Sequence, residues 1–289
     1  MIRPSDAAYR VARWPATDAF DLDVGIVYTH ERQWMGPLVS TLKASAEGAA
    51  TRLILVDNDS AEGVDAWRYV MPETLVLHNS TRLGYAANLN RILAASTARY
   101  VLLMNTDMFF DPGQRCLTRM VEFMDAHPDC GLSGCRLLHA DGNDALAARR
   151  FQNLPIILAR RLGLGRVMRD TLDRYFYREH ALQDSFDCDW LSGCFLMIRR
   201  KAFEQVGLFD ESFGKYFEDV DMCLRMARCG WRVMYHGGTS CYHIEQRTSR
   251  NLFSADAWRH ARAYLYWLNK WGYASHRHAV PPLQAATTG

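Results

Sequence analysis

Four apolar stretches in the first third of the chain end in clusters of polar side chains. They are DVGIVYT, RLILVDNDS, TLVLHN and ARYVLLMNTD. Stretches with helical spacing lie between them, from about Gln33 to Glu47, near Asp65, and through LGYAANLNRILAAS. Apolar strands that alternate with helices are typical of a parallel sheet covered on both faces. We predict an α/β fold with a mostly parallel central sheet, helices on both faces and a C-terminal helical segment, SADAWRHARAYLYWLNKWG.

Composition excludes several classes of protein. A net charge of +2 does not indicate a nucleic-acid-binding protein. The eight cysteines form no C-x-x-C pair, which favours reduced, buried thiols in a cytoplasmic protein over a zinc site. No apolar run reaches the ~18 residues of a membrane-spanning helix, and no signal core precedes the first strand. Any membrane contact is therefore expected to be peripheral.

The polar clusters at the strand ends are candidate ligand contacts, because ligands of such sheets gather at the carboxyl ends of the strands. Asp57 and Asn58 can bind a base or ribose, while Asp59 or Ser60 can instead cap a helix. Further along, Arg82 can meet a phosphate, Gly84 allows a tight turn or close approach, and Asn88 can point into the cleft. The alternative for HNSTRLGYAANLN is an ordinary helix start.

Asp107 follows the fourth apolar stretch and can bind a divalent cation, which prefers oxygen ligands. Asn105 occupies the first position of what would otherwise be a D-x-D pair. A plain turn in DMFFDPG is the alternative. His243, placed after an expected strand WRVMYH and a turn GGTSCY, is a second candidate metal ligand. A structural histidine is the alternative there, and His236 is interpreted as structural.

The stretch YFEDVD begins an expected helix over residues 217–229. Its apolar face consists of Phe217, Val220, Leu224 and Ala227. Asp221 and Arg225 are spaced to pair on the helix surface. Glu218 and Asp219 lie in the first turn, where the helix dipole alone can account for them. Next to the aromatic FGKY segment, however, a carboxylate can also serve as a general base.

Eight arginines between Arg149 and Arg178 mix with leucines and isoleucines. Such a segment can lie on an anionic membrane or hold a lipid diphosphate, and a solvated helical excursion is the alternative. In the C-terminal helix, Trp258, Tyr264, Trp267 and Trp271 are expected in the core or an interface.

The order of these motifs resembles the family 2 inverting glycosyltransferases with the GT-A fold, especially bacterial rhamnosyltransferase-like members. The motifs are VDNDS, N-x-x-x-LGYAAN-x-N, LLMNTD, DWLSGCFLMIRR, GLFDE-x-F-x-x-YFEDVD-x-C-x-R and the late histidine, between about Val24 and Ser249. GLFDE…YFEDVDMCLR is the most specific of them.

The resemblance implies a role for each site residue. Asp57, Thr29 and Asn58 would hold the nucleoside, with Arg82, Gly84, Asn88 and Asn105 near the nucleotide sugar. Asp107 and His243 would bind Mg²⁺ or Mn²⁺. Trp190 and Gly193 would wall the sugar site. Asp219 would be the base, and Glu218 would orient the acceptor or the sugar.

The implied function is metal-dependent transfer of L-rhamnose from dTDP-L-rhamnose to a glycan or lipid-linked acceptor. Alternatives are a UDP-hexosyl or galactofuranosyl transferase, a sugar nucleotidyltransferase and an inactive binding module. We expect a flexible N-terminus over residues 1–20, a nucleotide-sugar half over 21–110, an acceptor-binding and catalytic half over 111–250, and a C-terminal helix and tail over 251–289. The protein is expected in the cytoplasm, with peripheral contact to the inner membrane face through Arg149–Arg178.

Overall fold

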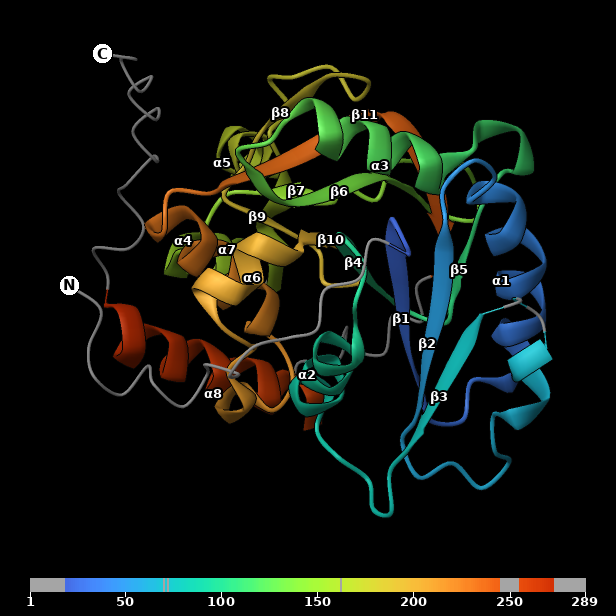
Figure 1. Cartoon of the computed structure of the whole chain (residues 1–289). Helices are drawn as coiled ribbons and strands as arrows, with labels where there is room; N and C mark the ends of the chain where they lie inside the picture. The colour runs from blue at the N-terminus through green and yellow to red at the C-terminus, as the bar shows by residue number, and fades with distance from the viewer. Residues whose placement is uncertain (1–18, 70, 72, 162, 245–254, 273–289) are drawn as a thin grey trace, which may run out of the picture.

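The computed structural model describes residues 19–69, 71, 73–161, 163–244 and 255–272. The expectations of a flexible start before residue 19 and of a tail after residue 272 lie outside the described residues. Figure 1 shows helices packed around one central sheet, with the C-terminal helix α8 at its side.

A nine-stranded sheet forms the centre of the molecule. The strand order is β3-β2-β1-β4-β10-β6-β11-β5, with β8 paired to β11. The bounds are β1 Leu22–Tyr28, β2 Thr51–Asp57, β3 Thr74–His78, β4 Tyr100–Met104, β5 Met108–Phe109, β6 Cys130–Leu138, β8 Ser185–Asp187, β10 Phe195–Arg199 and β11 Arg232–His243. The first four strands are parallel, and so are β6 and β11. The strand β10 runs antiparallel between β4 and β6, and β5 and β8 are antiparallel to β11. The predicted mostly parallel sheet is confirmed.

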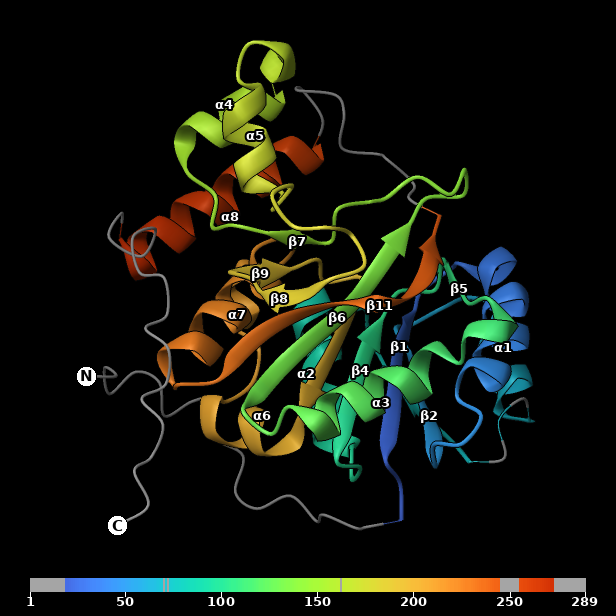
Figure 2. The ribbon, with the colours of Figure 1, turned by 90° about the horizontal axis from the view of Figure 1, so that it is seen from above.

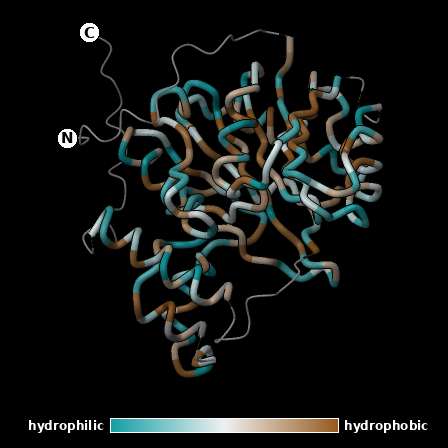
Figure 3. The backbone as a smooth tube through the Cα atoms, turned by 90° about the horizontal axis from the view of Figure 1, so that it is seen from below, coloured by the Kyte–Doolittle hydropathy of each residue, from teal (hydrophilic) through white to brown (hydrophobic). Residues whose placement is uncertain are grey.

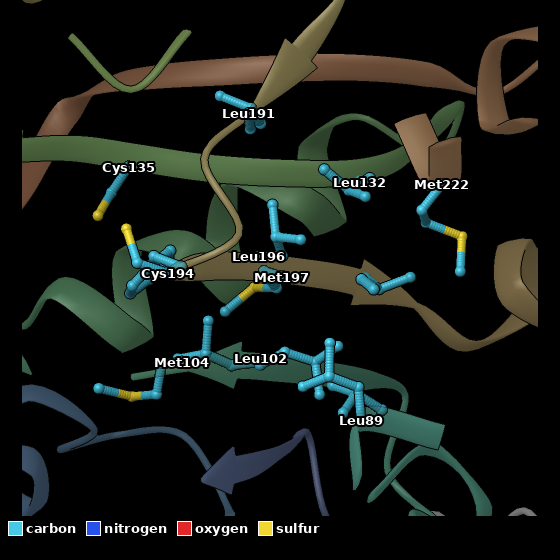
Figure 4. Packing of buried hydrophobic residues seen from close by; sticks show 14 of the residues in the cluster. Leu89, Leu102, Met104, Leu132, Cys135, Leu191, Cys194, Leu196, Met197 and Met222 are labelled. Carbon is cyan, nitrogen blue, oxygen red and sulfur yellow. The ribbon is translucent and has the colours of Figure 1, made fainter. Parts of the chain in front are cut away.

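Helices cover both faces of this sheet. On one face lie α1 (Arg32–Ser45) and α3 (Cys116–Ala126), and on the other lie α2 (Tyr85–Ala95), α6 (Arg200–Val206) and α7 (Glu218–Arg228) (Figure 1). Leu89 of α2 and Met222 of α7 pack with Leu102 and Leu132 of the strands (Figure 4). Figure 3 shows hydrophobic stretches of backbone gathered inside the body of the molecule. Burial of apolar side chains on both faces is what holds the polar strand ends in place.

A smaller part of the chain lies beside the main sheet. The short strands β7 (Ala148–Arg149) and β9 (Trp190–Leu191) form a second, antiparallel sheet. Between them the chain makes a lobe of α4 (Leu154–Arg161), the 3₁₀ turn η4 (Leu164–Arg166) and α5 (Arg169–Tyr175), which projects beside α8 (Ala255–Trp271) (Figure 2). Three further 3₁₀ turns are η2 (Asp65–Tyr69), η3 (Pro112–Gln114) and η5 (Glu211–Phe213).

Three local predictions were wrong. The helix expected near Asp65 is the short 3₁₀ turn η2. Asp59 does not cap it, because its backbone is left-handed (φ 57°), while the Ser60 hydroxyl accepts a hydrogen bond from the Gly63 amide at 3.1 Å. The segment GGTSCY is not a turn: it continues β11, whose register with β6 shifts between His236 and Ser240. A bulge, which inserts extra residues into a ladder, has no strong sequence signal here.

Buried ion pairs fix α8 against α7. Asp221 pairs with Arg225 at 2.8 Å as the spacing predicted, but the pair is buried, with Asp221 fully shielded from solvent, and not on the helix surface. Lys270 lies 2.8 Å from Asp221 and 2.7 Å from Asp210, and the Trp271 indole donates to Asp221 at 2.8 Å. Tyr264 and Trp267 are in the core as predicted, whereas Trp258 is 74% exposed.

All eight cysteines are free, and seven of them are buried, as predicted. Among the described residues, no helix combines the length and the apolar character needed to cross a lipid bilayer.

Candidate active site

The ends of β1, β2 and β3 lie side by side and form the donor edge, defined here as Thr29, Asp57, Asn58 and the loop 79–84. The register places Tyr28, Asp57 and His78 next to one another. One carboxylate oxygen of Asp57 accepts from the Ser60 amide at 2.9 Å, and the other lies 3.3 Å from Nδ1 of His78. The structure therefore brings Asp57, Asn58 and Thr29 to one edge, where they were expected.

Three buried amides hold the loop that borders this edge. The Asn79 side chain donates to Asn58 at 2.9 Å and to Asn88 at 2.7 Å. Asn58 accepts from the Leu83 amide, and Asn88 donates to the Leu83 and Gly84 carbonyls. Asn88 is fully buried, so the expectation that it points into the cleft was wrong. It fixes the loop instead, and Asn79, which ends the third apolar stretch, is the partner that sequence reasoning left unassigned.

Arg82 and Gly84 lie at the rim of the same loop. Arg82 is exposed, and its guanidinium lies 3.2 Å from Nδ1 of His30 on the neighbouring strand end. Gly84 precedes α2 with φ −65° and ψ 160°, an ordinary extended conformation. A side chain there would meet only the Gly214 carbonyl at 3.8 Å. The tight turn expected of Gly84 is therefore absent, and its place is at the rim, opposite the loop that precedes α7.

Asp107 and His243 form the metal corner. Because β5 pairs with the end of β11, Met108 lies opposite His243. Nε2 of His243 is 3.4 Å from Oδ1 of Asp107, and both side chains are mostly shielded. Burial opposes the charged imidazolium, but Cys194 and Asp107 outweigh it and raise the pKa of His243 to about 11. A metal ion bound here must displace that proton.

These two donors fit the cation that the resemblance implies. No cluster of three or more His, Cys, Asp or Glu side chains able to hold a metal exists in the described part of the chain. Mg²⁺ and similar ions are commonly bound by one or two protein ligands, with substrate phosphates and waters completing the shell. A carboxylate and an imidazole at one edge are therefore a sufficient protein share of such a site.

Tyr85 lies between the metal corner and the acids of α7. Its hydroxyl donates to Oδ1 of Asn105 at 3.1 Å. Burial raises the pKa of Tyr85, and the negative charges of Glu218, Asp219 and Asp107 raise it further. Sequence reasoning missed this residue, although it is the aromatic residue of the quoted LGYAAN motif.

Asp219 and Glu218 begin α7 after an unusual stretch of backbone. Tyr216 and Phe217 both have left-handed conformations, with φ 75° and 70°. Such residues cost about 1–3 kcal/mol each and persist only where the surrounding structure fixes them. Phe217 is buried against His260, Tyr264 and Trp267 of α8. The packing of α8 thus sets the position of the first turn of α7.

Asp219 is held by backbone amides and remains half-buried. One carboxylate oxygen accepts from the Gly193 amide at 2.9 Å, and the other accepts from the Val220 amide at 2.8 Å. Burial raises the pKa of Asp219. A side chain at position 193 would come within 3.1 Å of that carboxylate, so Gly193 lets the loop approach the base. Gly193 was expected to wall the sugar site, and the structure gives it this second task.

Glu218 is 7% exposed, and its Oε2 atom has no hydrogen-bond partner among the described residues. Burial, followed by the neighbouring Asp219, raises the pKa of Glu218 to about 8. Near neutral pH it therefore carries a proton, which a carboxyl can donate to a substrate hydroxyl. Glu218 is therefore suited to donate a hydrogen bond, and the adjacent Asp219 is the candidate to accept a proton.

The loop from Leu191 to Phe195 connects the metal corner with the base. The Gly193 amide binds Asp219, and the Cys194 carbonyl accepts from the Asn105 amide at 3.1 Å. Trp190, just before the loop, is buried, and its indole donates to the Arg150 carbonyl at 2.8 Å. The structure therefore brings together polar side chains at the strand ends, the Asp107–His243 pair and the Glu218–Asp219 pair of carboxyl groups.

Comparison with known proteins shows to which protein family the chain belongs. Residues 23–207 match the family described as glycosyl transferase family 2. The chain belongs to that family. This glycosyltransferase is 30% identical over 254 residues, 80% of each chain, to an N-acetylglucosaminyl-diphospho-decaprenol L-rhamnosyltransferase of Mycobacterium tuberculosis. It is 22% identical over 70% of its length to the O-antigen chain rhamnosyltransferase WbaN of Salmonella anatum, of which it covers 59%.

Solved structures confirm the GT-A fold. The glycosyltransferase superposes on GalNAc-T7, solved with UDP, GalNAc and Mn²⁺, with a TM-score of 0.62 at 13% identity, over 89% of this chain and 49% of the other. It superposes on the mannosyltransferase PcManGT of Pyrobaculum calidifontis, solved with GDP-Man and Mn²⁺, with a TM-score of 0.61 at 17% identity, over 93% of this chain and 69% of the other. Of the alternatives from the sequence, the sugar nucleotidyltransferase is set aside by the family match and the 30% identical relative.

Proposed function

We propose that this glycosyltransferase transfers L-rhamnose from dTDP-L-rhamnose, with inversion, to a sugar hydroxyl of a lipid diphosphate-linked or glycan acceptor. The observation that carries the proposal is the 30% identity to a rhamnosyltransferase named for a diphospho-decaprenol acceptor. A UDP-sugar transferase is the second candidate, supported by the fold neighbour solved with UDP.

The donor edge supplies the nucleotide contacts in this proposal. Asp57 and Thr29 lie where the nucleoside would bind, and Asn58 and Asn88 act through the loop that they hold. Arg82, at the rim, is positioned for a phosphate or for the nucleoside. Asn105 is fixed by Tyr85 and by the Cys194 carbonyl beside the metal corner.

Asp107 and His243 would hold Mg²⁺ or Mn²⁺, which supplies positive charge to a departing diphosphate. Asp219 takes the proton from the acceptor hydroxyl, and its two amide contacts fix the direction from which that oxygen attacks. Attack on the side opposite the departing group inverts the anomeric carbon. Glu218, protonated near neutral pH, donates a hydrogen bond that orients the acceptor or the sugar.

A donor panel tests this proposal. The enzyme is incubated with dTDP-L-rhamnose, UDP-glucose, UDP-galactofuranose and GDP-mannose, each with Mn²⁺ or with EDTA, and nucleotide release is measured. The proposal expects release from dTDP-L-rhamnose that requires the metal and rises when a GlcNAc-diphospho-prenyl acceptor is added. Preferential turnover of a UDP-sugar would select the second candidate. No turnover of any donor would support the binding module.

We also propose that the enzyme works at the inner face of the cytoplasmic membrane, through the lobe and α8. Val167 is 84% exposed at the end of η4, with Leu154 and Leu164 also exposed nearby. Arg166 and Arg169 are exposed on the same lobe. On α8, Trp258 and Leu265 are 74% and 65% exposed, and they are two turns apart on the outward face. Apolar and cationic side chains together suit the interface of an anionic bilayer.

Flotation with phosphatidylglycerol-containing vesicles tests this contact. We expect Arg166→Gln/Arg169→Gln and Trp258→Ala/Leu265→Ala to float less than the wild type. Arg68→Gln/Arg91→Gln, with the same loss of charge at the donor half, is the matched control. Equal flotation of all four proteins would contradict the membrane contact.

A further inference from the structure

Arg149 differs from the other arginines of its segment. Arg150 pairs with Glu179, and both Arg169 and Arg178 lie within ion-pair distance of Asp173. Arg149 is only partly exposed, yet its buried Nε has no hydrogen-bond partner, and its guanidinium has no carboxylate partner among the described residues. A buried guanidinium N–H without a hydrogen-bond partner costs free energy, which marks Arg149 as a candidate ligand-binding residue.

The position of Arg149 is fixed by the small sheet. Arg149 lies opposite Trp190 in the β7–β9 pair. Its Cζ atom is 4.8 Å from the centre of the Trp190 ring, and that ring is buried and held by its own hydrogen bond to the Arg150 carbonyl. A guanidinium stacked on an aromatic face keeps its N–H groups free at its edge. Stacking on the buried Trp190 ring thus holds the Arg149 guanidinium in place, with N–H groups available to donate hydrogen bonds.

The Arg149 guanidinium is connected through Trp190 to the loop that holds Asp219, the proposed base. Burial raises the pKa of Asp219, and the positive charge of Arg149 acts on that pKa in the opposite direction. Trp190 leads directly into the loop whose Gly193 amide binds Asp219. The same loop continues to Cys194, whose carbonyl accepts from the Asn105 amide. Arg149 belongs to the small β7–β9 sheet, whereas His243, one of the residues that would bind the metal ion, ends a strand of the main sheet.

We infer that Arg149, stacked on Trp190, binds a phosphate or diphosphate group attached to the acceptor sugar. The inference rests on the proposed function, because it uses Asp219 as the base for that same sugar. A guanidinium matches the paired oxygens of a phosphate, and such charge-assisted hydrogen bonds are the strong ones. An anion bound within one sugar of Asp219 would fix which hydroxyl reaches the carboxylate, and would accept the hydrogen bond for which Arg149 Nε has no partner among the described residues.

Binding of a prenyl diphosphate without any sugar tests the site apart from catalysis. Isothermal titration in EDTA, which keeps the metal corner empty, compares geranyl diphosphate with geraniol. We expect the wild type to bind the diphosphate and Arg149→Gln to bind it about 10- to 100-fold more weakly. Arg169→Gln, which removes an exposed charge from the same segment, is expected to bind like the wild type. Equal affinities for Arg149→Gln and the wild type, or no binding by the wild type, would overturn the inference.

Kinetics separate this role from an effect on the base. With a GlcNAc-diphospho-prenyl acceptor, Arg149→Gln should raise the acceptor KM about 10- to 100-fold and leave the donor KM unchanged. With an alkyl GlcNAc glycoside, which lacks phosphate, the KM of the variant should match that of the wild type. If Arg149 only tunes Asp219, kcat falls equally on both acceptors while both acceptor KM values stay unchanged, and the inference is wrong.

Two further measurements keep the outcomes distinct. Arg149→Lys retains the charge but loses the planar fork, so an intermediate KM is expected, and it provides a test should Arg149→Gln fold poorly. Turnover of dTDP-L-rhamnose by the wild type, with and without acceptor, is the second measurement. Absence of any turnover would refute the proposed function, while the geranyl diphosphate titration would still decide the anion site.

Discussion

The donor edge of this glycosyltransferase and the region around Asp219 are built in different ways. At the donor edge, consecutive parallel strands place their last residues in register, so Tyr28, Asp57 and His78 become neighbours through the sheet alone. Asp219, by contrast, is held by the Gly193 amide of the loop that follows β9, and the turn in which it lies packs against α8 through Phe217. Strand register alone brings the residues of the donor edge together, whereas Asp219 is positioned by segments that are distant in the sequence.

The sharpest test of this difference is Asp219→Asn. Loss of the base should lower kcat about 10²–10⁴-fold. Donor binding should persist, because the donor edge does not depend on this carboxylate. Acceptor-dependent turnover and a titration with the donor nucleotide measure the two effects. Near-normal turnover would remove Asp219 from its role.

Lys270→Met tests how far the position of α7, and with it Asp219, depends on α8. The change leaves the buried Asp210 and Asp221 without the cation that they share, at 2.7 and 2.8 Å. Removal of one partner from a buried ion pair costs about 3–5 kcal/mol. Urea unfolding should show that loss. The matched change Lys43→Met, in the last turn of α1, should have little effect, and equal losses in both variants would contradict the comparison.

Asp107→Ala and His243→Ala test the metal corner, which borders both regions. Each variant loses one of the two proposed metal ligands, so we expect Mn²⁺ affinity in the presence of nucleotide to fall at least about tenfold. Manganese titration followed by electron paramagnetic resonance measures it. The control is His78→Ala at the donor edge, which should bind Mn²⁺ like the wild type. Unchanged affinity in both corner variants would place the metal elsewhere.

A smaller effect is expected from the charge of Glu218. Its pKa is raised to about 8, so it holds its proton at neutral pH and loses it as the pH rises through about 8. The groups around it are Asp219, Lys215 and Tyr85. Ionisation adds a second negative charge beside Asp219, and kcat/KM of the wild type should therefore fall above about pH 8. Glu218→Gln, which stays neutral, should lack that fall.

The same shift has a consequence for stability. A carboxyl with a raised pKa in the folded protein becomes destabilising as the pH rises from its unfolded value of 4.5 towards about 8. The melting temperature of Glu218→Gln relative to the wild type should therefore increase across this interval. A constant difference between the two proteins would show that Glu218 ionises normally.

Sequence reasoning predicted most of the donor edge, because strand ends follow from apolar runs. It also placed Asp107 and His243 in one site, and the structure has them 3.4 Å apart. What it missed depends on long-range packing. Asn88 was expected to face the cleft, but its side chain is buried and accepts a hydrogen bond from Asn79. Asp221 pairs with Arg225 as expected, but Trp271 of α8 covers it. Neither Tyr85 nor Arg149 stands out until the loop and the small sheet are in place.

The contact between α8 and α7 also sets an order of events during synthesis. Chains are made from the N-terminus, and early parts begin to fold first. The donor edge uses residues that all leave the ribosome before α7. The first turn of α7, by contrast, waits for Tyr264, Trp267 and Lys270 of a segment made much later. A nascent chain would thus hold nucleotide contacts before it could align a base, which delays catalysis until α8 has been synthesised.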